Sequence, residues 1–557
     1  MHNNRVLVQR NNRILTQHDC RTLAHRNNRI LIHKKEGVNK MATPSKKLAE
    51  SLKELKKLQD KGIVAIKTSD LSRMHRERLL KNNFLREVMK GWYLSVPSNE
   101  EQGDSTSWYA SYWQFCSRYL SVRYGKSYCI SADQSLQIHS GNWTVPLQLI
   151  IRSAGGPNGI TPLLYKTSLF TMKSSLPNAA EIKVVEDIRM LSLPSALIHC
   201  SPAMFIKNPI DVRTALSMIK DSSDVLGLLL DGGHSTVAGR LAGAFRNIGR
   251  DRIAVEILKT MQTAGYDVRE SDPFESTPPA SIYTKSVSPY ANRIKLMWHE
   301  MRDVVLEHFP KAPSLPKNHS KFLKLIDEIY VTDAYHSLSI EKYKVTAELI
   351  ERVRSGKWDI EKNEEDKKQK DAMAARGYWL ASQKVRESIV KILNKENSGH
   401  VVEKDHGSWY RELFAPSVTA GILKASDLAG YRNNQVFISQ SKHVPLNIEA
   451  VRDTMPVLFE LLVNEKEASV RAVLGHFIFV FIHPYMDGNG RMARFLMNVM
   501  LASGGYPWTV IPVQERKIYM AALEKASVEK NIKDFSRFAA HLVSEGMKGT
   551  PVAKLIE

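Results

Sequence analysis

Cysteine is scarce in this sequence. The 557 residues contain four, Cys20, Cys116, Cys129 and Cys200, and no two of them stand at the short spacing of a zinc knuckle or a redox pair. The pattern excludes a small disulfide-stabilised scaffold and favours a reducing cytoplasm. Long apolar runs are also missing. None approaches the roughly 18 residues that a membrane-spanning helix needs, and no signal-type segment follows the N-terminal arginines. We expect a cytoplasmic protein with no membrane partner.

Acidic residues are too few to balance the basic ones. The chain has 79 Lys and Arg against 58 Asp and Glu, a formal net charge of +21. Residues 1–100 alone hold 22 Lys and Arg against 9 Asp and Glu. This asymmetry indicates a polyanionic partner near the N-terminus, and a solvated basic surface is the alternative.

The first forty residues have little that could form a core. "NNRVLVQR", "NNRILTQ" and "NNRILIHKK" begin at Asn3, Asn11 and Asn27, and they form a short basic repeat. Residues 1–40 are therefore expected to be disordered. They are either an arm that binds nucleic acid or sequence upstream of a translation start at Met41, and we favour the second interpretation.

Residues 41–100 have the pattern of a winged helix-turn-helix. A leucine stripe predicts one helix, "RMHRERLLKNN" predicts a basic helix, and "FLREVMKGWYLSV" predicts a hairpin. Residues 62–96 resemble the N-terminal winged helix of the abortive-infection type IV antitoxin family. In a winged helix the basic helix enters the major groove while the wing meets phosphate. Protein docking is the alternative to DNA binding. The expected DNA contacts are Arg73, Arg76, Arg78, Lys81 and Lys90.

Residues 101–270 mix strand-like and helical runs, which predicts an α+β domain. "LLDGGHSTVAGR" lacks the Gly-Lys-Ser/Thr ending of a phosphate loop, so a turn that caps a helix is the better interpretation. The place of this domain after the winged helix is similar to that of the antitoxin family's second domain. A Pro- and Ser-rich linker is expected at 271–295, and a helical C-terminal domain at 296–550.

The stretch "FIHPYMDGNGRMARF", residues 481–495, has the composition of a phosphate site. Pro484 ends an apolar helix, and two glycines permit an anion-binding turn at the start of the next helix. Arginines three residues apart share a face of that helix and can reach phosphates. Asp487 is a hard oxygen ligand suited to Mg²⁺. The ordinary pKa of a histidine suits His483 to general-base work.

This stretch resembles the motif of the Fic family, His-Pro-Phe-x-Asp/Glu-Gly-Asn-Gly/Lys-Arg-x-x-Arg, with tyrosine for phenylalanine at Tyr485. The resemblance covers about residues 320–545 and implies AMP transfer from ATP to a Tyr, Thr or Ser hydroxyl of a target protein. It implies a base at His483, Mg²⁺ at Asp487 and nucleotide contacts from Gly488, Asn489, Gly490, Arg491 and Arg494.

Two further segments resemble parts of the same family. "AGYRNNQVFISQSKHVPLNIEAV", from Ala429, looks like the Gly-x-Tyr-Arg segment and a β-hairpin flap that aligns the target chain. "YHSLSIEKYKVTAELIERV", from Tyr335, looks like an inhibitory helix, expected near 333–353. In its Ser/Thr-x-x-x-Glu-Gly/Asn pattern Ser337 and Glu341 fit, and Lys342 departs. Glu341 on a plain surface helix is the alternative. His476 is interpreted as a core residue.

Two classes of function remain open. The first is an autoinhibited protein adenylyltransferase with a DNA-binding N-terminal module, which could modify itself and could form a homodimer. The second is a DNA-binding regulator, related to toxin–antitoxin systems, whose C-terminal domain senses nucleotide or removes AMP. The complete motif favours the enzyme.

Overall fold

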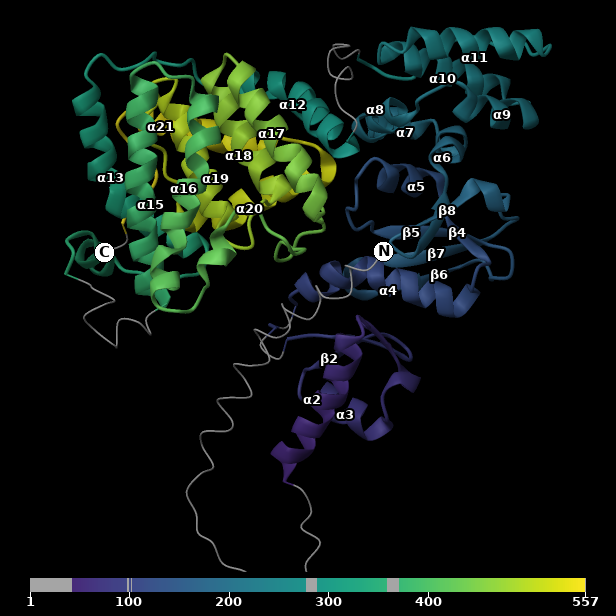
Figure 1. Ribbon diagram of the computed structural model, residues 1–557, viewed down its shortest axis with the longest axis horizontal. Helices are drawn as coiled ribbons and strands as arrows, with labels where there is room; N and C mark the ends of the chain where they lie inside the picture. The colour runs from purple at the N-terminus through teal and green to yellow at the C-terminus, as the bar shows by residue number, and fades with distance from the viewer. Residues whose placement is uncertain (1–42, 98–99, 102, 277–287, 358–369, 556–557) are drawn as a thin grey trace, which may run out of the picture. The chain divides into compact units, whose positions relative to one another are not determined.

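The computed structural model describes residues 43–97, 100–101, 103–276, 288–357 and 370–555 (Figure 1). The repeat at 1–40 lies outside them. The chain divides into two compact units. Unit 1 contains 1–138, 143–201 and 437–444, and unit 2 contains 139–142, 202–436 and 445–557. Each unit is described by itself.

The N-terminal part of unit 1 is a small helix and sheet assembly. It contains α2 (Pro44–Asp60), β1 (Ala65–Lys67), a 3₁₀ turn (Thr68–Asp70), α3 (Arg73–Lys81), β2 (Leu85–Met89) and β3 (Trp92–Ser95). The strands form an antiparallel sheet in the order β1-β3-β2. The leucine stripe of α2 meets α3 and the sheet in a core that includes Leu55, Ile66, Leu79 and Tyr93. The sequence predicts a helix, a short helix, a basic helix and a hairpin in this order; in the structure a strand, β1, and a 3₁₀ turn stand between α2 and the basic helix α3.

The second part of unit 1 is an α+β assembly, as expected. Helix α4 (Thr106–Tyr124) packs with a sheet of order β4-β5-β7-β6, whose β5 and β7 are parallel. The bounds are β4 Tyr128–Ile130, α5 Ala132–His139, β5 Gln148–Ser153, β6 Gly159–Pro162, β7 Ser168–Lys173, β8 Ile182–Val185, β9 Ile188–Leu191 and α6 Leu193–His199.

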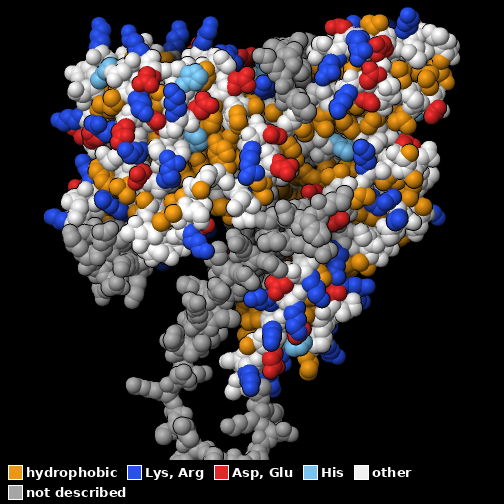
Figure 2. Space-filling view, viewed as in Figure 1, with side chains coloured by type: hydrophobic (Ala, Val, Ile, Leu, Met, Phe, Trp, Pro, Cys, Tyr) orange, Lys and Arg blue, Asp and Glu red, His pale blue; other side chains and the backbone are white. Residues whose placement is uncertain are grey.

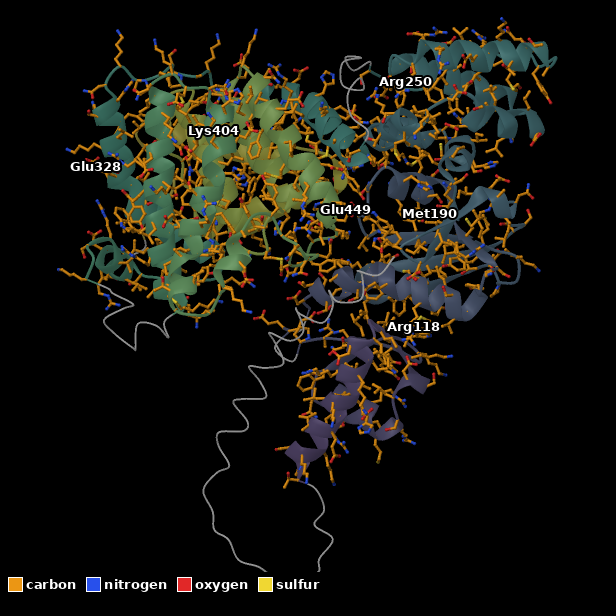
Figure 3. All side chains as sticks on the ribbon, in the orientation of Figure 1. Arg118, Met190, Arg250, Glu328, Lys404 and Glu449 are labelled. Carbon is orange, nitrogen blue, oxygen red and sulfur yellow. The ribbon has the colours of Figure 1, made fainter. Side chains whose placement is uncertain are left out.

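Helix α4 also holds the N-terminal sheet. Arg118, labelled on α4 in Figure 3, places Nη2 2.9 Å from a carboxylate oxygen of Asp70. Its Nη1 donates to the carbonyl of Ala65. Trp92 from β3 meets the rings of Phe115 and Tyr119 at 5.9 and 5.5 Å. The two parts of unit 1 therefore share one core.

The described residues of unit 2 form helices and the loops between them, with no strand. Helix α18 is buried over nearly its whole length and packs against α12, α17 and α19, which explains why its sequence is apolar on every face. The bounds are α7 Ala203–Lys207, α8 Pro209–Met218, α9 Ser223–Asp231, α10 Ser235–Asn247, α11 Asp251–Thr263, α12 Pro289–His308, α13 His319–Ile340, α14 Ala347–Arg354, α15 Lys370–Leu393, α16 Ser398–Thr419, α17 Ile448–Asn464, α18 Ala468–Ile482, α19 Asn489–Ala502, α20 Arg516–Glu529 and α21 Lys533–Met547.

The compact units do not follow the boundaries expected from the sequence. Unit 2 takes up the chain at Pro202, so α8 to α11 belong with the C-terminal helices and not with the sheet before them. Helix α12 begins at Pro289, inside the expected linker, and residues 277–287 of that linker lie outside the described part. A buried ion pair explains this association, because Asp211 of α8 pairs with Arg293 of α12.

Candidate active site

The site is built where α18 ends and α19 begins. The backbone N–H of His483 still donates to the carbonyl of Phe479, at 3.0 Å, and then the chain turns. His483 has φ 56° and ψ 61°, a left-handed conformation that is uncommon for any residue but glycine. The proline that follows disfavours helical geometry at this position. The strained backbone of His483 therefore helps to set the position of its imidazole ring.

The imidazole of His483 has a defined tautomer. Its Nδ1 lies 3.1 Å from the carbonyl oxygen of Val480, which can only accept, so Nδ1 carries the proton and Nε2 is the acceptor. Burial lowers the pKa of His483 to about 4, and the bond to Val480 opposes that shift. The side chain is therefore neutral near pH 7, which is the state that a general base requires.

Arg432 braces the turn at His483, and the sequence alone gave this residue no role. Its backbone N–H donates to the carbonyl of Pro484 at 2.8 Å, and its Nε donates to the carbonyl of His483 at 2.8 Å. Two other guanidinium nitrogens donate to the carbonyls of Asn434 and Leu446. Arg432 is 3% exposed, and burial lowers its pKa to about 10. The side chain of Arg432 fixes the strained turn. The arginine of "AGYR" is the sequence feature that could have indicated this role.

The side chain of Asn489 closes the loop through hydrogen bonds to the loop backbone. Its Oδ1 accepts from the backbone N–H of Tyr485 at 2.9 Å, and its Nδ2 donates to the carbonyl of the same residue at 2.8 Å. The ring of Tyr485 stacks on Tyr410, with centroids 3.7 Å apart. Asn489 was expected to contact the nucleotide. In the structure its side-chain amide bonds to the loop backbone, where the two bonds close the turn.

The two glycines of the loop serve different purposes. Gly488 has φ 81°, a conformation that glycine adopts without strain, and a Cβ there would come within 2.9 Å of the Phe414 ring. Gly490 has no such angle. A Cβ at Gly490 would clash with a carboxylate oxygen of Glu341 and lie 3.2 Å from Nη1 of Arg494. The missing side chain leaves a space beside the first turn of α19, whose N–H groups have no partner within the helix.

Arg494 borders this space, and Arg491 follows Gly490 directly in the chain. Arg491 is 1% exposed and Arg494 is 3% exposed. Nε of Arg491 and Nη1 of Arg494 are buried without a hydrogen-bond partner among the described residues. Two buried cations with unused donors at a helix N-terminus form a strong anion site. The arrangement fits nucleotide phosphates.

Arg494 is held by the segment that was expected to be inhibitory. Its Nε donates to Oγ of Ser337 at 2.9 Å, and its Nη2 donates to the carbonyl of Ser337 at 3.0 Å and to Glu341 at 2.8 Å. Burial alone would raise the pKa of Glu341, but the charges of Arg494 and Arg491 hold it below its ordinary value. The carboxylate is ionised, so the contact is a charge-assisted pair.

The segment that was expected to be an inhibitory helix is not one helix over 333–353. Helix α13 ends at Ile340, and α14 begins at Ala347. Lys342 has φ 66° in the turn between them. Glycine and asparagine tolerate this left-handed geometry best, which gives a physical reason for the usual Gly or Asn where this chain has lysine.

Asp487 could hold a magnesium ion only with help. Its side chain is 69% exposed and lies 3.6 Å from Nη2 of Arg491. Within the described residues, no three acidic, histidine or cysteine side chains gather as a metal site. Mg²⁺ commonly binds one or two carboxylates together with substrate phosphates. A single exposed carboxylate beside the anion space fits a magnesium ion that the protein shares with the phosphates of a bound nucleotide.

The expected β-hairpin flap is not a hairpin. Residues 431–447 contain no strand, and a turn occupies Ser439 and Gln440. Arg432 binds the carbonyls of Asn434 and Leu446, and Gln435 binds that of Pro445, so side chains replace a strand ladder. Residues 437–444 belong to unit 1, where Lys442 accepts from the backbone of Val145 and Gln440 donates to Thr106.

The basic residues expected to meet DNA fall into two groups. Arg76 donates to the carbonyls of Thr68 and Leu71, and Arg78 donates to the carbonyl of Lys47 and to Ser51. These two side chains support α3 from within. Arg73, Lys81 and Lys90 are exposed, although Arg73 pairs with Glu77 at 2.6 Å. Figure 2 shows Lys and Arg side chains interspersed with acidic ones over this part.

His476 is a core residue. Its Nε2 lies 2.8 Å from the hydroxyl of Tyr519, and burial lowers its pKa to about 3.

Among the described residues, no helix is long and apolar enough to cross a membrane.

Comparison with known proteins identifies the family that this site resembles. Residues 406–501 match the Fic/DOC family model. The matched segment contains the turn after α18, the start of α19 and Arg432, so the C-terminal helical domain is Fic-like.

Two relatives are named protein adenylyltransferase Fic. The Nematostella vectensis protein is 28% identical over 252 residues, which are 44% of this chain and 55% of that protein. The Drosophila virilis protein is 30% identical over 217 residues, 38% of this chain and 41% of that protein. The matches thus span only about half of each relative. A solved structure of Fic-1 from C. elegans aligns at 16% identity with a TM-score of 0.35, over 61% of this chain and 87% of that one.

Proposed function

We propose that the protein is an adenylyltransferase that moves AMP from ATP to a hydroxyl group of a target protein. The proposal rests on two features of the site: a histidine nitrogen that can accept a proton, and buried arginine donors that can bind phosphate. Nε2 of His483 can accept a proton, Arg491 and Arg494 are buried with unused donors, and Nη1 of Arg494 borders the space beside Gly490. The two relatives named protein adenylyltransferase support the same activity.

The geometry suggests a role for each residue. His483 Nε2 takes the proton of the target hydroxyl as its oxygen bonds to the α-phosphorus. The bond between that phosphorus and the bridging oxygen then breaks, and pyrophosphate leaves. Arg491 and Arg494 bind the β- and γ-phosphates, and the backbone at Gly488 and Gly490 receives the α-phosphate. Catalysis is mostly positioning and charge neutralisation.

Asp487 would hold Mg²⁺ together with phosphate oxygens, and a bound ion would neutralise part of the phosphate charge.

Glu341 keeps this activity low in the proposal. Its carboxylate already occupies the space at Gly490 and uses a donor of Arg494 that a γ-phosphate needs. ATP that enters beside Glu341 would place its α-phosphate out of line with His483. The inhibition is thus a competition between two anions for one buried guanidinium.

The N-terminal part of unit 1 is proposed to bind DNA. The order of its elements and its antiparallel three-stranded sheet support a winged helix-turn-helix. Exposed Lys81, at the end of α3, and Lys90, at the turn between β2 and β3, supply charge where helix and wing would meet phosphate.

Incubation of the full chain with ATP labelled at the α-phosphate, magnesium and native lysate tests the enzyme. We expect label on protein, more with Glu341→Gly than with wild type and none with His483→Ala. If Glu341→Gly binds ATP but labels nothing, the chain is a nucleotide-sensing regulator. If Glu341→Gly instead releases AMP from a protein that already carries it, the chain is an enzyme that removes AMP.

A further inference from the structure

The guanidinium group of Arg491 lies between two aromatic rings. Its Cζ is 5.3 Å from the ring centre of Tyr343 and 5.1 Å from that of Phe414. Phe414 belongs to α16, while Tyr343 lies in the turn between α13 and α14, two residues after Glu341. The arginine is thus enclosed by two segments that are remote from it in sequence.

Aromatic contacts of this kind leave the edge of a guanidinium free. A cation attracts the face of a ring, whereas phosphate binds the N–H groups at the guanidinium edge. Nε of Arg491 is buried without a hydrogen-bond partner among the described residues, and the carboxylate of Asp487 is 3.6 Å from Nη2. The two rings therefore flank the cation while its Nε stays available to a phosphate.

We propose that Tyr343 is a positioning residue that fixes Arg491 for the phosphates beyond the α-phosphate, so that the site prefers ATP to AMP. The inference rests on the proposed function, because it needs nucleotide phosphates at the start of α19. An arginine has several rotatable bonds, and fixing it before binding removes an entropic cost that the ligand would otherwise meet.

Of the two aromatic residues that contact Arg491, Tyr343 is the one that can be tested separately. Phe414 also packs against Gly488, at 2.9 Å from the position of a Cβ, so its removal would disturb the loop itself. Tyr343 is half-buried, which makes substitution tolerable. The same turn that places Glu341 on Arg494 therefore places a ring on Arg491.

The experiment uses the full chain with Glu341→Gly as the parent, so that turnover can be measured. Tyr343→Phe keeps the ring, and Tyr343→Leu and Tyr343→Gln remove it. Tyr335→Leu is the matched control, because Tyr335 also belongs to this region but contacts the ring of His336. Calorimetry gives the Kd of ATP and of AMP with magnesium, and initial rates give KM and kcat.

We expect Tyr343→Leu and Tyr343→Gln to raise the Kd and KM of ATP about tenfold, which lies within the range for a partly buried cation–π contact. The Kd of AMP and kcat should change less than about twofold on that physical basis. Tyr343→Phe and Tyr335→Leu should match the parent.

Each other result overturns the inference. Equal weakening of ATP and AMP would mean general damage to the site. Faster turnover at unchanged affinity would show that Tyr343 acts on the rate and not on nucleotide binding. Unchanged ATP affinity in both ring-free variants would remove it from nucleotide binding. If the parent itself binds no ATP, the proposed function fails, and this inference fails with it.

Discussion

The carboxylate of Glu341 accepts a hydrogen bond from Nη2 of Arg494 at 2.8 Å, in the space that opens because residue 490 is glycine. Arg494 also holds Ser337 through its Nε and Nη2. The last turn of α13 is thereby tied to the second turn of α19. One buried guanidinium joins the segment proposed to inhibit to the segment proposed to bind phosphate.

Removing that carboxylate should release the site. We expect Glu341→Gly to raise the rate of AMP transfer at least about tenfold, equivalent to roughly 1.4 kcal/mol of barrier. Adding Arg494→Ala should abolish the gain, because the same guanidinium then cannot bind phosphate. Initial rates with labelled ATP measure both effects. A Glu341→Gly protein that binds ATP but is no faster than wild type would remove Glu341 from the mechanism.

Lys342 should be replaceable with a gain in stability. Its φ of 66° is strained for lysine, by roughly 1 to 2 kcal/mol, and strain-free for glycine. Lys342→Gly should therefore raise the free energy of unfolding by about 1 kcal/mol, after the greater freedom of glycine in the unfolded chain is counted. Denaturant unfolding measures the change.

Lys342→Ala is the control for that prediction. Alanine removes the same long side chain but keeps a Cβ, so the left-handed strain remains and no gain is expected. Equal stabilisation by alanine and glycine would show that the lysine side chain, and not its backbone angle, was unfavourable.

His483 should act on rate and not on nucleotide affinity. We expect His483→Ala to lower kcat by about 10² to 10⁴ while the Kd of ATP stays close to that of the parent. Calorimetry and initial rates, both in the Glu341→Gly background, separate the two quantities. An equal loss of ATP affinity would contradict the assignment of His483 as the base.

The lowered pKa of His483 fixes the direction of its pH dependence. Because the pKa is about 4 in the folded protein, the base is neutral throughout pH 6 to 8 and should impose no change in rate there. Its rate limb should lie near pH 4, where the imidazole gains a proton. Between the ordinary pKa and about 4, the unfolded chain binds this proton and the folded chain does not, so stability should fall as pH falls. A base limb near pH 6.5 would contradict the burial argument.

Local sequence predicted the parts of the site that are made by neighbouring residues. The strained His483 turn and the adjacent arginines follow from Pro484, the glycines and the helix that starts at Asn489. The sequence did not assign roles to Arg432 and Tyr343, because their partners lie far away along the chain. The flap was predicted as a hairpin from resemblance, but its carbonyls bind side chains of Arg432 and Gln435 instead.

The N-terminal fold shows the same limit. Helix spacing predicted α2 and α3 with their leucine core, and turn chemistry predicted the hairpin. The pattern of charge could not show which basic side chains point outward. Arg76 and Arg78 turn inward because carbonyls at the 3₁₀ turn and on α2 lie within reach of their guanidinium groups. Direction depends on tertiary neighbours that a single sequence does not give.

That division of the basic residues gives the last prediction. If unit 1 binds DNA, exposed Lys81 and Lys90 bind phosphate groups, and removing either lysine should reduce the slope of log K against log salt by about 0.9. Lys81→Ala with Lys90→Ala should therefore flatten the slope by about 1.8 and leave the fold intact.

Fluorescence anisotropy with duplex DNA across a salt series measures that slope. Lys53→Ala with Lys56→Ala removes the same charge from exposed positions on α2, and it should change the slope less because α2 is not the groove-binding helix. Arg78→Ala should act differently from either pair. It removes two charge-assisted hydrogen bonds, one to the carbonyl of Lys47 and one to the buried Ser51, so it should lower the free energy of unfolding by about 1 to 3 kcal/mol. Equal slope changes in the two lysine pairs would indicate non-specific attraction, and no measurable DNA binding would favour a protein-docking role for the same fold.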